Sequence, residues 1–532
     1  GQQGLLYLLR EAEVPGFTGR DHMSQRHAVS ELSAGWSLWP MDIVVASLEM
    51  TPAETPPMPV STAMRDALHA RMKGYIRHNP ALDRTLVSFQ ANRGVPFYSW
   101  FKYREGFSEA LVTYLLNHLH PRPGVLLDPF AGGGSALFAA SALGWQAKGI
   151  EVLPVGMYAM RTRIIAASID ANEFRDVLTR LATINFSEHF SEDHALKHIA
   201  ITRGAFPPDE ERDLVGYISY CHRYITNEDV RSLLLYAAFC ILEEISYTRK
   251  DGQYLRWDVR SGRSQGKRPF NKGRILSFRE ALDGKLDQMA MDLGLGPTQG
   301  MLFEDTSHAR TTSPQPELYE GSCLDLLPKM ADGSIDFVLT SPPYANRYDY
   351  TRTYALELVY LGCDGEHVKQ LRQAMLSCTV ENRDKREQLR QCYHAMGRET
   401  AFQLVDSTFQ RQAALQEVLG ILDRYRDEGK LNNENIARLV RNYFYEMCFT
   451  VYELARLLKP GGVIAMVNDN VRYAGEEVPV DLILSDMAES FWLRVRHIWT
   501  LGRGKGNSSQ QMGNHGRSEL RKCVYVWEKA PS

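Results

Sequence analysis

The stretch from residue 125 to residue 151 restricts the fold of this chain more than any other part of it. An apolar run at 125–127 is typical of a buried parallel strand, and a glycine-rich turn follows it. Small side chains at 135–143 indicate a helix, and the strand-like run after it ends in the acid Glu151. A strand, a turn, a helix and a second strand in this order open a doubly wound sheet. We therefore predict an α/β protein.

The rest of this sheet is spread along the chain. Strand-like apolar runs return at 318–319, 335–339, 461–469, 495–501 and 522–529. The last two are expected to pair as antiparallel strands. Residues 62–78 look helical, and the patterns at 157–310 and 365–458 are mostly helical. The sequence thus predicts one sheet that is divided by two helical insertions.

Composition limits what such a protein can be. The 532 residues suit a large catalytic domain with additional modules, and the net charge of −3 means that any nucleic-acid contact must come from a local basic patch. The eight cysteines form no CxxC pair, which argues against a zinc ribbon and against a disulfide framework. There is no signal-peptide pattern and no apolar stretch near 18 residues, so we expect a cytosolic protein without a membrane span.

The first motif is the turn Asp128-Pro129-Phe130-Ala131-Gly132-Gly133-Gly134-Ser135. Glycines allow a tight turn and a close approach of the backbone to a ligand, and the following helix begins with free N–H groups. No Gly-Lys-Ser/Thr follows, so the turn is not a P-loop. Glu151 ends the next strand about 20 residues later, where an acid can bind ribose hydroxyls. Alone, the turn is equally a plain strand–helix connection, but with Glu151 it favours a nucleotide-like cofactor.

The second motif, Thr340-Ser341-Pro342-Pro343-Tyr344, directly follows the strand-like run at 335–339. Two successive prolines fix the backbone and leave their carbonyls free to accept hydrogen bonds from an amine. Ser341 adds a hydroxyl and Tyr344 an aromatic face. In isolation this motif is also compatible with a plain turn. Its position after a strand of a cofactor-binding sheet favours catalysis.

Together the two motifs resemble those of the S-adenosylmethionine-dependent DNA amino-methyltransferases, which modify cytosine N4 or adenine N6. The flanking segments at 88–112, 319–339 and 457–470 resemble that family too, and the resemblance covers about half of the chain. It implies S-adenosylmethionine as cofactor and a Rossmann-like sheet of seven strands, mostly parallel, with large helical insertions. In this family a serine before Pro-Pro-Tyr points to cytosine N4, as in restriction-modification and phage-defence enzymes, whereas Asp or Asn points to adenine N6.

The resemblance also assigns roles to individual residues. The expected cofactor-binding residues are Lys102, Phe107, Ser108, Asp128, Pro129, Phe130, Gly132, Gly134, Ser135, Glu151, Ser322, Cys323 and Thr340. The expected catalytic residues are Ser341, Pro342, Pro343 and Tyr344. Ser322 departs from the family pattern, because many members have an aspartate after the glycine at this point.

A mechanism follows from these roles. An amino group inside a duplex is inaccessible to a buried methyl donor, so the base must be flipped out. We expect the base to stack on Tyr344, while Ser341 Oγ and the Pro342 carbonyl accept hydrogen bonds from its amino group. Direct in-line transfer of the methyl group then needs no metal and no cysteine nucleophile.

The resemblance divides the chain into six parts. They are 1–60, of unknown role; 61–165, with the cofactor motif; 166–316, a basic helical insertion and candidate target-recognition region; 317–364, with the catalytic motif; 365–445, a second helical insertion; and 446–532, the final strands.

A contact surface for double-stranded DNA is predicted within the first insertion. Residues 249–274 contain nine Lys or Arg and two Asp, with aromatic residues between them, and such a stretch can neutralise phosphates. The expected DNA-binding residues are Arg249, Lys250, Arg256, Arg260, Lys267 and Arg268, with Arg503 and Lys505 in the glycine-rich loop 502–518. A solvated basic loop is the alternative interpretation.

Other functions are compatible with these motifs. They are methylation of adenine N6, of RNA guanine N2 or of protein glutamine, and binding of cofactor and DNA without catalysis. The family resemblance further implies a prokaryotic, nucleoid-associated cytoplasmic enzyme, with a cognate restriction endonuclease or defence-system proteins as possible partners.

Overall fold

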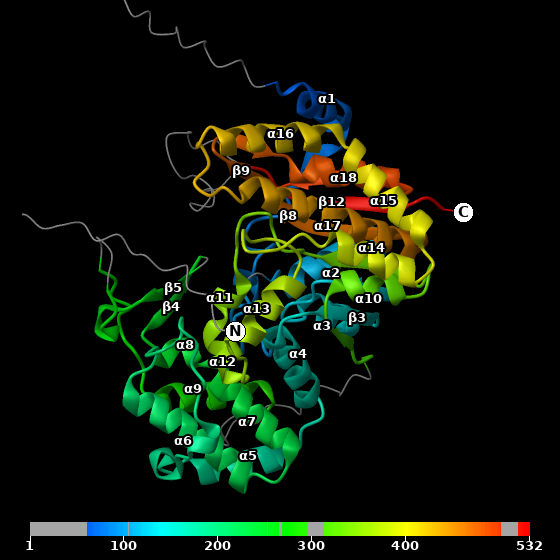
Figure 1. Cartoon of the computed structure of the whole chain (residues 1–532). Helices are drawn as coiled ribbons and strands as arrows, with labels where there is room; N and C mark the ends of the chain where they lie inside the picture. The colour runs from blue at the N-terminus through cyan, green and yellow to red at the C-terminus, as the bar shows by residue number, and fades with distance from the viewer. Residues whose placement is uncertain are drawn as a thin grey trace, which may run out of the picture. The chain divides into compact units, whose positions relative to one another are not determined.

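Eight strands form one mixed sheet in the part of the chain that the computed structural model describes, which is 61–104, 106–252, 254–264, 269–295, 313–501 and 520–531 (Figure 1). In spatial order the strands are β6 (Glu317–Glu320), β3 (Gln146–Glu151), β2 (Val125–Asp128), β7 (Ile335–Thr340), β8 (Leu458–Asp469), β12 (Lys522–Lys529), β11 (Leu493–Thr500) and β1 (Ile76–His78). The first five are parallel to one another, β12 is antiparallel to both of its neighbours, and β1 is parallel to β11. The α/β class, the mostly parallel sheet and the antiparallel final pair are confirmed.

The sheet has one strand more than the seven expected. We predicted a helix over 62–78, but α1 (Ala63–Met72) ends earlier, and β1 then pairs with residues 498–500 of β11. A strand of three residues is too short to show the alternation that identifies strands in a sequence. Its partner lies more than 400 residues later, so only the tertiary fold reveals it.

Alternating side chains of the central strands bury two faces of the sheet. Leu126 and Phe337 belong to the core on one face, together with residues of α2 (Glu109–Leu119) and α3 (Ser135–Ala142). Leu127 and Val338 belong to the core on the other face, with α17 (Ile436–Leu457) and α18 (Val480–Ser490). A central strand buried on both faces is apolar at successive positions, which is why the runs at 125–127 and 335–339 were recognisable.

The first insertion has a core of its own. Its helices are α5 (Ala171–Leu181), α6 (Pro208–Tyr224), α7 (Glu228–Cys240), α8 (Leu242–Ile245) and α9 (Phe278–Asp292). They pack with α4 (Pro154–Ala166) and α12 (Ala355–Tyr360) around buried aromatic and aliphatic side chains, in the lower part of Figure 1. The basic stretch is not only a loop, because it contains the antiparallel hairpin β4 (Thr248–Asp251) and β5 (Tyr254–Trp257).

The second insertion follows the catalytic loop. Its helices are α13 (Gly365–Ala374), α14 (Arg386–Ala395), α15 (Glu399–Arg411) and α16 (Ala413–Asp427), and the short helix α11 (Tyr350–Thr353) lies before it. α17 is continuous across residue 445, at which the insertion was expected to end. The remaining α-helix is α10 (Cys323–Leu326), and the remaining strands are the hairpin β9 (Val471–Tyr473) and β10 (Glu476–Val478).

No helix among the described residues has both the length and the apolar character that crossing a membrane requires. The expected N-terminal part, 1–60, lies outside the described residues.

Candidate active site

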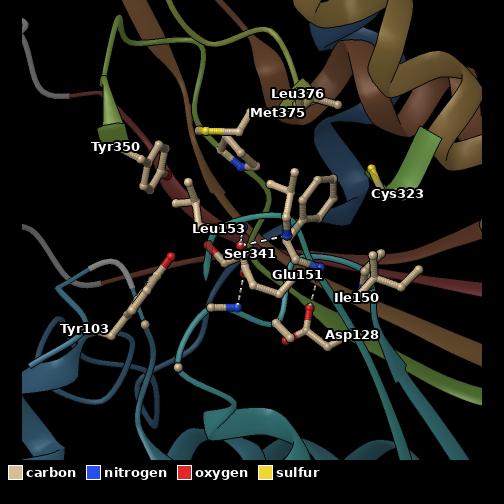
Figure 2. A pocket seen from close by; sticks show the side chains of 18 of the residues that line it. Tyr103, Asp128, Ile150, Glu151, Leu153, Cys323, Ser341, Tyr350, Met375 and Leu376 are labelled. Atoms are coloured by element: carbon tan, nitrogen blue, oxygen red, sulfur yellow. Dashed lines mark hydrogen bonds between the residues drawn. The ribbon is translucent and has the colours of Figure 1, made fainter. Parts of the chain in front are cut away.

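A pocket of about 740 Å³, including solvent space at its mouth, lies where β2, β3, β6 and β7 end. The carboxyl ends of parallel strands meet at one edge of a sheet, and loops from this edge bind ligands in open α/β folds. Both sequence motifs contribute to the lining, which Figure 2 shows around Glu151 and Ser341.

The glycine turn brings backbone close to this pocket. Gly132 and Gly134 have φ angles of +55° and +79°, in the left-handed region that favours glycine. A Cβ atom on Gly132 would lie 2.9 Å from the ring of Tyr103, which also lines the pocket. The turn therefore requires glycine both for its conformation and for its contact with Tyr103.

Asp128 ends β2 as a buried side chain. Its Oδ1 accepts hydrogen bonds from Thr340 Oγ1 at 2.7 Å and from Phe130 N at 3.1 Å. Burial raises the pKa of Asp128 to about 7, against which the Thr340 hydrogen bond acts. The first of these bonds joins the cofactor motif on β2 to the catalytic motif on β7.

Glu151 ends β3 and organises the turn around it. Its Oε2 accepts from Gly132 N at 2.6 Å, and its Oε1 accepts from Val152 N at 3.0 Å and Leu153 N at 2.7 Å. Burial raises the pKa of Glu151, whereas these backbone donors lower it. A carboxylate can accept about four hydrogen bonds. Three are used, so Glu151 keeps capacity for one more donor, such as a ribose hydroxyl.

The structure brings most of the expected cofactor residues to the pocket. Those that line it are Phe107, Asp128, Pro129, Phe130, Gly132, Ser135, Glu151, Ser322 and Cys323. Gly134 and Thr340 do not line it. Gly134 shapes the glycine turn, and Thr340 donates a hydrogen bond to Asp128, which does line the pocket.

Two of the expected cofactor-binding residues, Ser108 and Lys102, do not line the pocket. Ser108 is buried as the N-cap of α2, where its Oγ accepts from Leu111 N at 3.1 Å and donates to the Leu86 carbonyl. A serine before an apolar helix is a cap more often than a ligand contact. Lys102 is exposed and outside the pocket lining. Neither residue therefore lines the pocket in which the other expected cofactor residues lie.

Sequence reasoning missed several walls of the pocket. Tyr103 comes from the segment before α2, and Met375 and Leu376 follow α13 (Figure 2). Tyr350 belongs to the segment 346–352 after the catalytic loop, for which the sequence left two roles open, a wall of the base pocket or support of the loop. An aromatic residue near the motifs was a weak signal for Tyr103. Nothing in the local sequence marks Met375 or Leu376, because they belong to an insertion that the tertiary fold returns to the pocket.

The catalytic loop leaves the same edge of the sheet. Ser341 and Pro343 line the pocket, whereas Pro342 is buried and Tyr344 lies outside the lining. Ser341 Oγ donates to Tyr344 Oη at 3.4 Å, a long hydrogen bond. Ser341 thus stands between the pocket and the Tyr344 side chain.

The expected DNA-binding residues have different environments. Arg249 and Arg256 are exposed cross-strand partners on the β4–β5 hairpin, and Arg260 is half-exposed and paired with Asp258 at 2.7 Å. Lys250 is only 5% exposed and forms an ion pair with the buried Glu357, so it does not belong to a DNA-contact surface. Lys267, Arg268, Arg503 and Lys505 lie outside the described residues.

The pocket fits S-adenosylmethionine, because its carboxylates can accept from ribose and attract a sulfonium while Tyr103, Leu153 and Tyr350 offer apolar surface. With a Ser-Pro-Pro-Tyr loop at its edge, this defines the class of methyltransferases that use that cofactor. Known proteins narrow the class further, although no family model matches the chain.

Over 465 residues the chain is 43% identical to the type II methyltransferase M.AvaI of Nostoc sp., covering 87% of this chain and 92% of the relative. The same values hold for M.AvaI of Anabaena variabilis. Over 468 residues it is 39% identical to the type II methyltransferase M.BsoBI of Geobacillus stearothermophilus, covering 85% and 90%. The chain belongs to the type II methyltransferase family, and its cofactor is S-adenosylmethionine.

Proposed function

We propose that this type II methyltransferase acts on double-stranded DNA and methylates cytosine at N4 after flipping the base out of the helix. One observation carries the choice of base: the residue that lines the cofactor pocket at the start of the Pro-Pro-Tyr loop is Ser341, not an aspartate or asparagine.

The bound cofactor supplies an electrophilic methyl group. Asp128 and Glu151 attract its positive end and hold its ribose, while the Gly132 turn keeps the backbone close. Ser341 Oγ, which lines the pocket, and the Pro342 carbonyl accept hydrogen bonds from the amino group of the base and aim its nitrogen at the pocket. The nitrogen forms its bond to the methyl group as the bond between that group and the cofactor sulfur breaks, and one amino proton is released. Holding two reactants in line in this way is a large source of rate acceleration.

Two arginines support DNA as the substrate. Arg249 and Arg256 oppose each other on the exposed face of the β4–β5 hairpin. Two exposed arginines side by side concentrate positive charge that a DNA phosphate can neutralise, and Arg256 also pairs with Asp251 at 3.2 Å. The hairpin therefore suits a backbone contact, and we propose it as part of the target-recognition region.

The relatives are named type II methyltransferases, and this supports a restriction endonuclease as the partner of the enzyme. We propose that the modification protects DNA against a cognate restriction endonuclease, and that the enzyme acts in the cytoplasm.

Methyl-labelled S-adenosylmethionine and mixed-sequence duplex DNA test the proposal. After incubation, the DNA is digested to nucleosides and the labelled nucleoside is identified by mass. We expect N4-methylcytosine. Label on N6-methyladenine would overturn the choice of base, and label on RNA or protein alone would overturn DNA as substrate.

A further inference from the structure

Two charged side chains stand beyond Ser341, on the side of Tyr344. Asp469 ends β8, and Lys522 begins β12 as its cross-strand partner. Their Oδ2 and Nζ atoms are 3.7 Å apart. Because β8 is the parallel neighbour of β7, its end lies beside the start of the catalytic loop.

The ammonium group is close to the surface on which the base is expected to stack. Lys522 Nζ lies over the Tyr344 ring, 5.9 Å from its centroid. A base that stacks on this face of Tyr344 therefore meets the ammonium group.

The ion pair between Asp469 and Lys522 does not use all the hydrogen-bonding capacity of the carboxylate. Asp469 Oδ1 is buried and has no hydrogen-bond partner among the described residues, which leaves a polar atom unsatisfied. Buried polar atoms are nearly always satisfied, so this oxygen is available to a further hydrogen-bond donor. Burial also raises the pKa of Asp469, against the attraction of Lys522 and Arg84. These features suit a polar wall that can bind a ligand.

We propose that Asp469 and Lys522 form the wall of the target-base pocket that reads the pairing edge of the flipped base. Lys522 donates a hydrogen bond to the ring nitrogen next to the amino-bearing carbon, which is N3 in cytosine, and Asp469 orients the ammonium group. A flipped base has lost its pairing partner, so its ring nitrogen needs such a donor. This inference rests on the proposed function, because it assumes a base stacked on Tyr344.

The test combines a protein variant with a change in the base. The recognition site is first mapped on methylated mixed-sequence DNA, and duplexes are then made with cytosine or 3-deazacytosine at the target position. Lys522→Met removes the donor and keeps the length of the side chain. Lys459→Met is the matched control, because Lys459 pairs with Asp336 at 2.7 Å at the opposite end of β8.

With cytosine, Lys522→Met is expected to slow methylation by roughly 10- to 100-fold, as for loss of a charged hydrogen bond. Its cofactor Kd should stay within about 2-fold of the unchanged protein, and Lys522→Arg should retain most of the rate. With 3-deazacytosine the unchanged enzyme slows, but Lys522→Met slows little further. The loss of rate from Lys522→Met and the loss of rate from 3-deazacytosine then do not multiply, as is expected when the side chain contacts the ring nitrogen directly.

Losses that multiply, or a Lys522→Met enzyme that behaves like Lys459→Met, would overturn the inference. Failure of the cytosine proposal is recognised separately, because the labelled nucleoside is then N6-methyladenine. In that case 1-deazaadenine replaces 3-deazacytosine, and the same comparison decides whether Lys522 contacts the base. Asp469→Asn should give a smaller loss than Lys522→Met, since it weakens only the orientation of the donor.

Discussion

The cofactor pocket and the basic hairpin were both predicted from short stretches of sequence. The structure brings most of the residues predicted for the pocket together, but it separates those predicted for the hairpin into exposed and buried ones. At the pocket, nine of the thirteen expected cofactor-binding residues line one cavity. On the hairpin, Arg249 faces solvent while its neighbour Lys250 is buried against Glu357. Motifs that act through backbone geometry were located well, whereas a count of positive charges does not tell an exposed cation from a buried one.

The physical reason is the alternation of a β-strand, in which successive side chains point to opposite faces. In β4, positions 248 and 250 are buried, and 249 and 251 are exposed. Lys272 in the same basic stretch also turns inward, where its Nζ donates to the Ser246 carbonyl at 2.7 Å. Part of the local charge of this stretch therefore stabilises the insertion.

The largest expected effect contrasts the two faces of the hairpin. Lys250→Met leaves Glu357 buried without its partner and should lower the free energy of unfolding by about 3–5 kcal/mol. Urea or thermal unfolding measures this loss. Arg256→Met is the matched control, because its ion pair with Asp251 is exposed, and should cost less than about 1 kcal/mol. Equal losses would mean that the buried pair is not what supports the hairpin.

At the pocket, Glu151→Ala should weaken cofactor binding by at least about 100-fold. The change removes an acceptor for the cofactor and leaves three backbone N–H groups without their partner. Calorimetric titration with S-adenosylmethionine measures the Kd. Glu320→Ala is the control, because Glu320 is the register partner of Glu151 on β6 but pairs with Arg161 at the surface. The assignment fails if both variants bind equally well.

Ser341→Ala should reduce kcat by roughly 10- to 100-fold while the cofactor Kd stays within about 2-fold. The hydroxyl is expected to contact the base and not to hold the cofactor. Single-turnover methylation and cofactor titration separate these effects. Ser334→Ala, at the other end of β7, removes only a hydrogen bond to the Ala331 carbonyl and serves as control. If Ser341→Ala bound the cofactor more weakly, Ser341 would be assigned to cofactor binding and not to contact with the base.

The pKa of about 7 for Asp128 predicts that cofactor affinity rises by about tenfold between pH 6 and pH 8. A cationic cofactor prefers the ionised carboxylate, which forms as the pH passes 7. Because this pKa is above the ordinary value of 3.8, burial also makes Asp128 contribute stability below pH 4 that is lost as the pH rises through about 7. Titrations at several pH values measure the effect. Asp128→Asn should abolish the pH dependence of cofactor affinity. If the variant kept the same pH dependence, another group would be responsible for it.

The smallest expected effect concerns DNA. Arg249→Ala should weaken DNA binding by a few-fold and lower the slope of log affinity against log salt by about 1. Binding isotherms at several salt concentrations give this slope. Arg494→Ala, an exposed arginine paired with Glu528 near one end of the sheet, is the control. A slope that changes equally in both variants would remove the hairpin from the DNA surface.

The sequence by itself determined the α/β class, the two motifs and the strands that carry them, because buried central strands and glycine or proline turns have local signatures. It also identified Asp128 and Glu151, since each ends a recognisable strand.

Only the tertiary structure decided where the other parts of the site come from. The eighth strand, the inward side of Lys250, the capping role of Ser108, the Met375 and Leu376 wall and the Asp469–Lys522 pair all depend on contacts between distant segments. Burial and pairing of a side chain are properties of its neighbours in space, and the local sequence does not contain them.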